Sequence, residues 1–166
     1  MYIDDVTRES LLQKELRQTK PFQSPRQEAA LSILKTADVV RRTLSRAIEP
    51  HGITLQQYNV LRILRGAGLE GLPTLEIPER MIEQAPGITR LIDRLERKRL
   101  VSRERCPEDR RQVTCRISES GLDLLAKMDV SLDHADDALF AALSTAEQRQ
   151  LIKLLDRVRA DVDLPA

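Results

Sequence analysis

The fold of this chain is decided by residues Gly87 to Ile117, with the sequence GITRLIDRLERKRLVSRERCPEDRRQVTCRI. Apolar residues at helical spacing predict a helix over 87–98 with one apolar face. That face holds Ile88, Leu91, Ile92 and Leu95, and the opposite side holds Thr89, Arg90, Asp93, Arg94 and Arg97. A buried stripe opposite a row of arginines suits a helix packed on a core and laid into a DNA groove. A solvated amphipathic helix would give the same pattern.

The second half of this stretch predicts a β-hairpin. A short mixed strand over 100–106 is followed by the turn Pro107–Arg111, because Pro fixes φ and Asp can bond its own backbone. The next strand alternates, with Val113, Cys115 and Ile117 on one side. A hairpin with a charged tip directly after a basic helix indicates a winged helix-turn-helix. In that arrangement the helix enters the major groove and the tip reaches an adjacent minor groove.

The charges of the chain are unevenly distributed. Residues 89–116 contain ten Lys or Arg and five Asp or Glu, whereas residues 118–166 contain five basic and ten acidic residues. The formal net charge of +1 therefore hides a basic segment followed by an acidic one. A basic segment this local favours contact with phosphate. Chance clustering on an ordinary surface is the alternative.

Length and composition indicate an intracellular protein of modest size. A chain of 166 residues fits one domain with extensions, and Leu, Ile, Val and Ala must form its core because aromatic residues make up only 2%. No run of eighteen apolar residues is present, so no membrane span is expected. The start, Met1–Asp5, lacks the features of a secretory signal. Two cysteines make no disulfide framework, so we expect a cytoplasmic protein.

Capping signals divide the part of the chain before residue 87 into helices. A weak helix candidate covers residues 4–16. Ser24 followed by Pro25 and Gln27 predicts a helix that begins there and runs to about Glu49. A second capping box at 54–57 opens a helix to about Arg65. In the segment 74–82, Pro78 predicts either a regular helix that begins near it or an irregular first turn from Thr74.

The part after residue 117 predicts two further helices. One begins at Ser118 and extends to about Leu143, and a third capping box at 144–147 opens the last. The predicted fold is mainly α. A winged helix-turn-helix domain with a small β-hairpin wing (53–118) is flanked by long helices that form a dimerisation region (24–52 and 119–166). Residues 1–23 form a helical arm. The long helices carry more apolar stripe than a small winged domain covers, which favours a two-fold dimer.

These motifs resemble the signature of the MarR family. They are LERKRLVSR at 95–103, PEDRR at 107–111 and ISESG at 117–121, with TLQQYNVL at 54–61 and ITR at 88–90 upstream. The resemblance covers about residues 27–160, and its most specific element is the Asp-x-Arg of the wing.

The resemblance implies a homodimeric transcriptional regulator that binds pseudo-palindromic sites in double-stranded DNA. It also implies repression that is relieved by a small-molecule effector or, in one branch, by cysteine oxidation. By position, Arg111 would enter the minor groove, oriented by Asp109, and Arg110 would contact phosphate. Thr89 and Arg90 match positions near the bases. The full set of expected DNA-binding residues is Gly87, Thr89, Arg90, Arg94, Arg97, Arg110 and Arg111.

Several individual roles stay open at this stage. Arg90 could bond a guanine edge, contact phosphate or face solvent. Arg111 could instead form only an exposed salt bridge with Asp109. Cys106 has arginines nearby, which can lower a thiol pKa, so a redox role is one interpretation. Cys115 is expected to be a small buried residue, about opposite residue 102 or 103 in the hairpin, too far from Cys106 for a disulfide.

Two residues depart from the family pattern. Arg99 stands where the family has Gly before the first strand of the hairpin. If the backbone there is left-handed, a non-glycine residue costs about 1 kcal/mol. Pro78 stands where the family has a helix-favouring residue, which weakens the prediction for the first helix of the helix-turn-helix.

No arrangement of residues indicates enzyme chemistry. His51 and His134 belong to no metal-ligand spacing, there is no Gly-rich phosphate loop, and no nucleophile, base and orienting group are set together. We therefore expect no catalytic residues, no metal and no cofactor. The remaining alternative to a DNA-binding regulator is a protein-interaction module with a winged-helix fold that no longer binds DNA.

Overall fold

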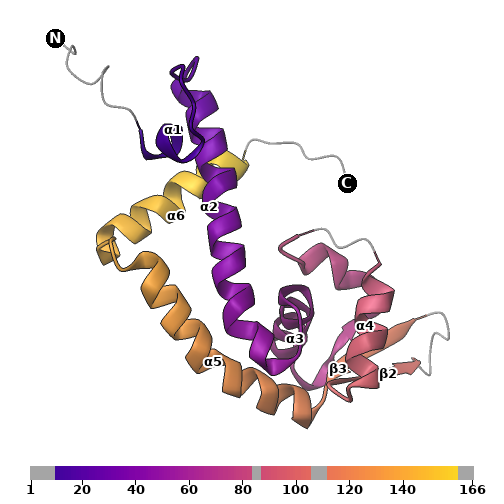
Figure 1. Ribbon diagram of the computed structural model, residues 1–166. Coiled ribbons are helices and arrows are strands. Elements are labelled where there is room, and N and C mark those ends of the chain that lie inside the picture. Colours follow the sequence, from indigo (N-terminus) through magenta and orange to yellow (C-terminus); the bar gives the residue numbers. More distant parts are fainter. Residues whose placement is uncertain (1–9, 84–86, 106–111, 161–166) are drawn as a thin grey trace. The chain divides into compact units, whose positions relative to one another are not determined.

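The computed structural model describes residues 10–83, 87–105 and 112–160. The chain divides into two compact units, one ending at Arg42 and the other beginning at Thr43. The first unit contains α1 (Leu11–Glu15) and most of α2 (Pro25–Ile48) (Figure 1). Ser10 begins α1 by accepting a hydrogen bond from the Gln13 amide at 3.2 Å. The predicted helix over 4–16 is thus helical at its end, and its residues 4–9 lie outside the described part.

The start of α2 is capped as its sequence predicts, with one shift. The Ser24 hydroxyl accepts a hydrogen bond from the Gln27 amide at 3.3 Å. The Gln27 side chain accepts from the amide of Gln23, one residue before the cap, at 2.9 Å. The helix ends at Ile48, followed by the 3-10 turn η1 (Glu49–His51) and by Gly52 in the left-handed conformation.

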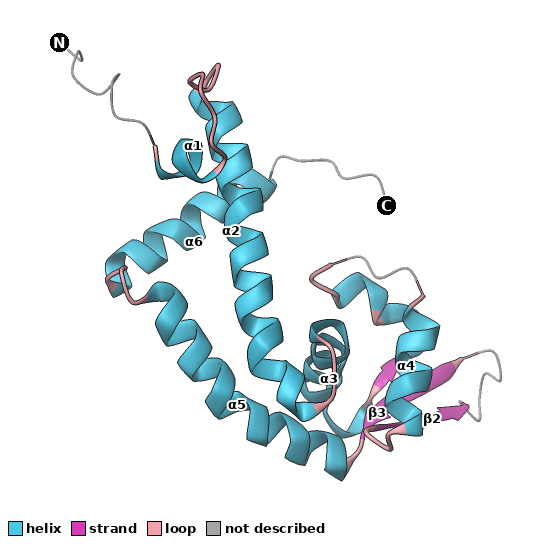
Figure 2. Ribbon diagram, viewed as in Figure 1, coloured by secondary structure: helices cyan, strands magenta, loops and turns pink. Residues whose placement is uncertain are grey.

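The second unit combines helices with a small sheet (Figure 2). Both expected capping boxes form here: Thr54 and Gln57 bond each other's backbone amides at 3.2 and 3.1 Å, and Ser144 and Glu147 do the same at the next one. The predicted mainly α fold with a β wing is confirmed. Its elements, besides the last turns of α2, are α3 (Leu55–Ala67), β1 (Leu72–Pro73), α4 (Ile88–Arg97), β2 (Val101–Arg105), β3 (Val113–Ile117), α5 (Glu119–Phe140) and α6 (Thr145–Ala160).

The sheet is antiparallel, in the order β1-β3-β2. Strands β2 and β3 form the predicted hairpin, with Arg103 opposite Cys115 as expected. The short strand β1 on the other side of β3 was not predicted. Gly71 precedes it with φ at +71°, and a Cβ there would lie 2.5 Å from the carbonyl oxygen of Cys115. This close approach requires glycine.

The core lies between α3, α4, α5 and the sheet. Ile92 and Leu95 of α4 are fully buried, together with Leu64 of α3 and Leu125 of α5. The predicted apolar stripe of α4 is therefore confirmed as a buried face. Each such side chain stabilises the fold by about 1.5–3 kcal/mol through removal from water.

The segment between β1 and α4 differs from the expected regular helix at Pro78. It forms two 3-10 turns, η3 (Thr74–Glu76) and η4 (Pro78–Arg80), and Met81 then adopts an extended conformation. The irregular turn from Thr74 was expected; the regular helix was wrong. Pro78 has no amide hydrogen to donate, and the 3-10 turn ends before a full α-helical turn develops. Ile77, which is fully buried, holds this segment against the core.

The turn between α4 and β2 uses a left-handed residue, as the family pattern suggested. Arg99 has φ of 58°, although it is not glycine. Its carbonyl oxygen accepts a hydrogen bond from the Ser118 hydroxyl at 2.7 Å, and Ser118 caps α5. In the first turn of α5, a Cβ on Gly121 would collide with the carbonyl oxygen of Leu100. The ends of α4 and of the hairpin are therefore fixed to the start of α5.

Candidate nucleic-acid interface

Helix α4 is placed by its two ends and by its buried face. Gly87 is the N-cap residue with φ of +89°, and among the described residues, its chain neighbours aside, no atom lies within 4 Å of the position of an added Cβ. Glycine is therefore favoured at this position by backbone conformation rather than by space. Gly87 therefore sets the direction in which α4 begins. Its predicted role as a DNA-binding residue stays a prediction.

The exposed side of α4 carries the predicted basic row. Thr89, Arg90, Arg94 and Arg97 are all exposed. Arg97 donates from Nε to the carbonyl oxygen of Asp93 at 3.3 Å. Within the described residues, the side chains of Arg90 and Arg94 have no ionic or hydrogen-bonding partner. Their guanidinium groups are thus available for an acceptor from outside the chain.

Asp93, unlike the exposed arginines beside it on α4, is bonded to a residue of the sheet. It is half-buried, and its Oδ1 lies 2.8 Å from Nη2 of Arg103, on strand β2. Arg103 also donates from Nε to Oε2 of Glu96 at 3.0 Å, and its Nη2 bonds the same carboxylate. The hydrogen bond from Arg103 holds the pKa of Glu96 below its ordinary value. Sequence reasoning missed this role of Arg103.

The hairpin strands lead to the predicted wing tip. Four predicted site residues, Cys106, Asp109, Arg110 and Arg111, lie outside the described residues. On the outer face of the hairpin, Arg116 pairs with Glu104 at 2.6 Å and donates to the carbonyl oxygen of Leu69 at 3.0 Å. The charge of Arg116 is therefore compensated within the hairpin.

Cys115 is fully buried in β3. Burial raises the pKa of its thiol to about 11, so the thiol stays protonated near neutral pH. The prediction of a small buried apolar residue is confirmed. A buried, protonated thiol is unreactive toward oxidants, which react with the thiolate.

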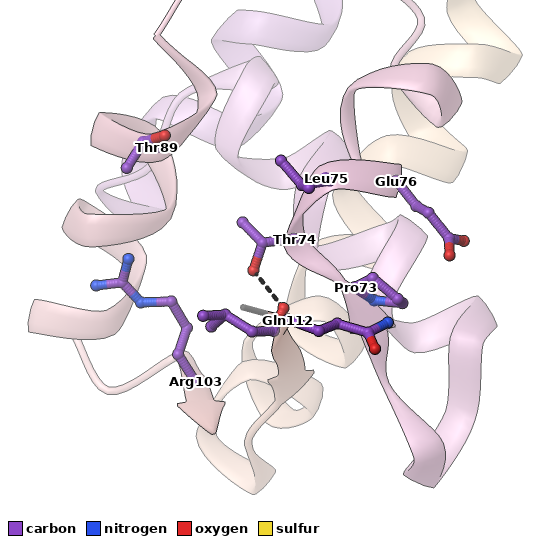
Figure 3. A pocket seen from close by; sticks show the side chains of 8 residues that line it. Pro73, Thr74, Leu75, Glu76, Thr89, Arg103 and Gln112 are labelled. Carbon is purple, nitrogen blue, oxygen red and sulfur yellow. Dashed lines mark hydrogen bonds between the residues drawn. The ribbon is translucent and has the colours of Figure 1, made fainter. Parts of the chain in front are cut away.

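A hollow of about 550 Å³ lies beside Thr89 (Figure 3). Figure 3 shows Arg103 directed from β2 toward the α4 side, and Thr74 donating to the carbonyl oxygen of Val113 at 2.9 Å. Sequence reasoning missed the hollow, since its walls include β1 and η3. The lining residues are Pro73, Thr74, Leu75, Glu76, Thr89, Arg103, Gln112 and Val113.

The described residues contain no group of three His, Cys, Asp or Glu side chains placed to hold a metal ion. None of their helices combines the length and the apolarity that crossing a membrane requires.

Comparison with known proteins identifies the family. The family model for MarR matches residues 53–113, which span α3 to the start of β3. The HTH-type transcriptional regulator MhqR of Bacillus subtilis (strain 168) is 32% identical over 117 residues, which are 69% of this chain and 78% of that protein. The chain belongs to the MarR family. It is thus a transcriptional regulator and not an enzyme, as the sequence predicted.

Solved structures share this fold. A MarR transcription factor from Planctomyces limnophilus is 37% identical, with a TM-score of 0.64 over 82% of this chain and 98% of that one. MepR of S. aureus, solved in complex with DNA, has a TM-score of 0.72 over 80% of this chain and 97% of that one. At 22% identity, the likeness to MepR concerns the fold alone.

Proposed function

We propose that this MarR-family regulator is a homodimeric repressor that binds a pseudo-palindromic operator in the cytoplasm, where chromosomal DNA lies. The observation that carries the proposal is the division of α4 into two faces. Ile92 and Leu95 are fully buried, while Thr89, Arg90 and Arg94 are exposed. A helix held on one side with donors on the other is suited to a major groove.

Nearby arginines outside α4 are neutralised by carboxylates of the chain, but the exposed arginines of α4 are not. This difference supports a DNA-binding role for the exposed row of α4. Arg103 and Arg116 are paired with carboxylates on their own chain, whereas the side chains of Arg90 and Arg94 have no partner within the described residues. Unpaired cations on one exposed face bind DNA phosphates, and the counterions that those phosphates held are released. In this proposal Arg90 contacts a base, and Arg94 and Arg97 contact bases or phosphates.

The wing completes the proposed interface. In this proposal Arg111 enters the minor groove, Asp109 orients Arg111, and Arg110 contacts a phosphate. All three residues lie outside the described part of the chain. Support comes from the antiparallel pairing of β2 and β3, the strands on either side of residues 106–111, directly after α4. MepR, whose solved structure is a complex with DNA, has the same fold, which also supports the proposal.

The proposed dimer follows from the apolar surface of the last helix. No residue of α6 is buried in the single chain, and Ile152, Leu154 and Val158 are about half exposed. An apolar stripe of this kind favours a second copy as its cover. In this proposal residues 24–52 and 119–166 form the dimerisation region, residues 1–23 form an arm, and residues 53–118 bind DNA.

A small-molecule effector is part of the proposal, and the hollow beside Thr89 is its candidate site. A molecule held there would lie against a residue that we place near the bases. Pro73, Leu75 and Val113 line the hollow with apolar side chains, so we expect small apolar molecules, tested in turn, to release the wild-type protein from its operator. Filling the hollow by Val113→Phe should abolish that release.

The test of DNA binding is a titration of the protein onto its operator, selected from random duplexes, and onto a scrambled duplex at several salt concentrations. The proposal predicts affinity that falls with salt and a clear preference for the operator. A stable dimer that ignores every duplex and instead captures a protein partner would favour the interaction module. Binding without sequence preference would reject sequence-specific regulation.

A further inference from the structure

Arg103 connects the wing to α4 through two carboxylates. Its guanidinium contacts Asp93 at 2.8 Å and Glu96 at 3.0 Å, and these two acids lie one helical turn apart on the same side of α4. We call Arg103 with Asp93 and Glu96 the Arg103 bridge. It lies next to the exposed row and near Thr89, which lines the same hollow as Arg103.

We propose that Arg103 is a positioning residue that fixes the rotation of α4 about its own axis against the wing. It thereby sets which side chains of α4 face the bases. The inference rests on the proposed function, because it names a determinant of the sequence preference at that same surface. Arg103 itself is a quarter exposed and is already bonded to two acids, so it is not a DNA contact here.

The base of the bridge is rigid. Arg103 lies at the middle of the β2–β3 ladder, directly opposite Cys115. Directly opposed residues share one face of an antiparallel pair, so Arg103 extends from the face on which Cys115 is fully buried. A movement of Arg103 would therefore disturb the core side of the sheet, and its guanidinium is a fixed point for α4.

The chemistry of the bridge requires arginine. The planar guanidinium presents Nε and Nη donors in a fixed fork and can bond two carboxylates in set directions. A lysine ammonium supplies one point charge on a flexible stem, so it compensates charge without fixing an angle. Asp93 and Glu96 give Arg103 two attachment points one turn apart, on the side of α4 between its buried stripe and its exposed row, and together they resist rotation of the helix more than one of them would.

Arg116 offers a matched control. It also pairs with a carboxylate, Glu104, but that acid belongs to the hairpin and not to α4. Arg116→Gln therefore removes an arginine and an ion pair from the same sheet without changing what holds α4.

The decisive experiment compares Arg103→Gln with the double variant Asp93→Asn, Glu96→Gln. These variants break the same bridge but change the net charge in opposite directions. A positioning role predicts that both reduce the operator-to-scrambled affinity ratio about tenfold, the effect of displacing one base-reading arginine. Arg103→Lys should recover only part of the ratio, and Arg116→Gln should leave it unchanged. A role limited to charge predicts instead that the acid variant binds all duplexes more tightly at an unchanged ratio, which would overturn the proposal.

A second measurement separates this inference from the proposed function. Hydrogen exchange of the α4 amides in the DNA-free protein should become faster in both bridge variants and stay unchanged in Arg116→Gln. If the wild type prefers no sequence, the proposed function fails and the exchange result alone decides whether the bridge holds α4. Unchanged α4 exchange in both variants would overturn the inference. If Arg103→Gln does not fold, the acid variant and Arg103→Lys decide in its place.

Discussion

Helices α4 and α6 are both amphipathic, but only α4 has its apolar face covered within one chain. Ile92 and Leu95 of α4 are fully buried against neighbouring elements of the second unit. In α6, Leu154 is 48% and Val158 56% exposed, and no residue is buried. Helical periodicity predicted both helices and both stripes equally well. It did not indicate which stripe the chain itself covers, and that difference separates the DNA-reading part of the proposal from the dimerising part.

The largest expected effect comes from removing a covered side chain. Leu95→Ala should lower the free energy of unfolding by about 2–5 kcal/mol, because it leaves a cavity in a core that cannot close fully. Denaturant unfolding at two protein concentrations checks this, with the loss equal at both. Leu154→Ala is the matched change in α6. Its effect on the free energy of unfolding should depend on protein concentration, because this face is covered only in the proposed dimer. Equal, concentration-independent losses for both variants would mean that the two helices are covered in the same way.

The next effect concerns the uncovered face. Leu154→Glu should weaken the dimer by about 1.5–3 kcal/mol per copy, because it replaces a buried apolar contact by a charge. Sedimentation equilibrium measures the change. Lys153→Gln is the control, since it alters an exposed neighbour on α6 by the same charge. A wild-type protein that is monomeric at micromolar concentration would contradict the assignment of this face.

The exposed face of α4 gives a smaller effect, on binding alone. Arg90→Ala should lose about 1–3 kcal/mol on the operator and relax specificity, while stability stays unchanged. Fluorescence anisotropy on operator and scrambled duplexes measures both. Arg149→Ala, an exposed arginine of α6, is the control. Equal loss on both duplexes would make Arg90 a phosphate contact instead.

The turn after α4 should permit a stabilising change. Arg99→Gly should raise the free energy of unfolding by about 1 kcal/mol or less, because φ of 58° is strained for arginine and not for glycine. Thermal unfolding at fixed protein concentration measures this gain. A loss of stability would show that the Arg99 side chain makes contacts worth more than the backbone strain.

The smallest effect is a dependence on pH. Arg103 holds the pKa of Glu96 below the ordinary 4.5, so the ionised form is favoured in the folded chain. The resulting stabilisation is complete above the unfolded pKa and is lost as pH falls through the lowered folded value. Wild type and Glu96→Gln should therefore differ in unfolding free energy at neutral pH and converge as the pH falls below the lowered pKa of Glu96. A gap that does not change with pH would contradict the ion pair.

The sequence was sufficient for features that depend on local chemistry. Capping residues such as Thr54 and Ser144 located helix starts, and alternation around Cys115 located β3 and its buried face. Features that depend on packing were missed. Strand β1 has two residues and no pattern of its own, and only Gly71 hinted at a close approach.

The candidate site divides in the same way. The exposed arginines of α4 followed from helical spacing, because opposite faces of a helix can be assigned from sequence alone. The bond between Arg103 and α4 did not, because spacing within a strand says nothing about which helix packs over it. Pro78 indicated an irregular turn, which the structure has as η4, whereas the full burial of Ile77 beside it depends on packing and was not predicted.

The central claim is that two copies of α4, related by a two-fold axis, bind one DNA duplex. Selection of bound duplexes from a random pool tests this claim most directly. The account predicts enrichment of an inverted repeat whose half-sites lie about one helical turn apart, roughly 10 base pairs. Recovery of an unrepeated site, or of no site at all, would contradict it.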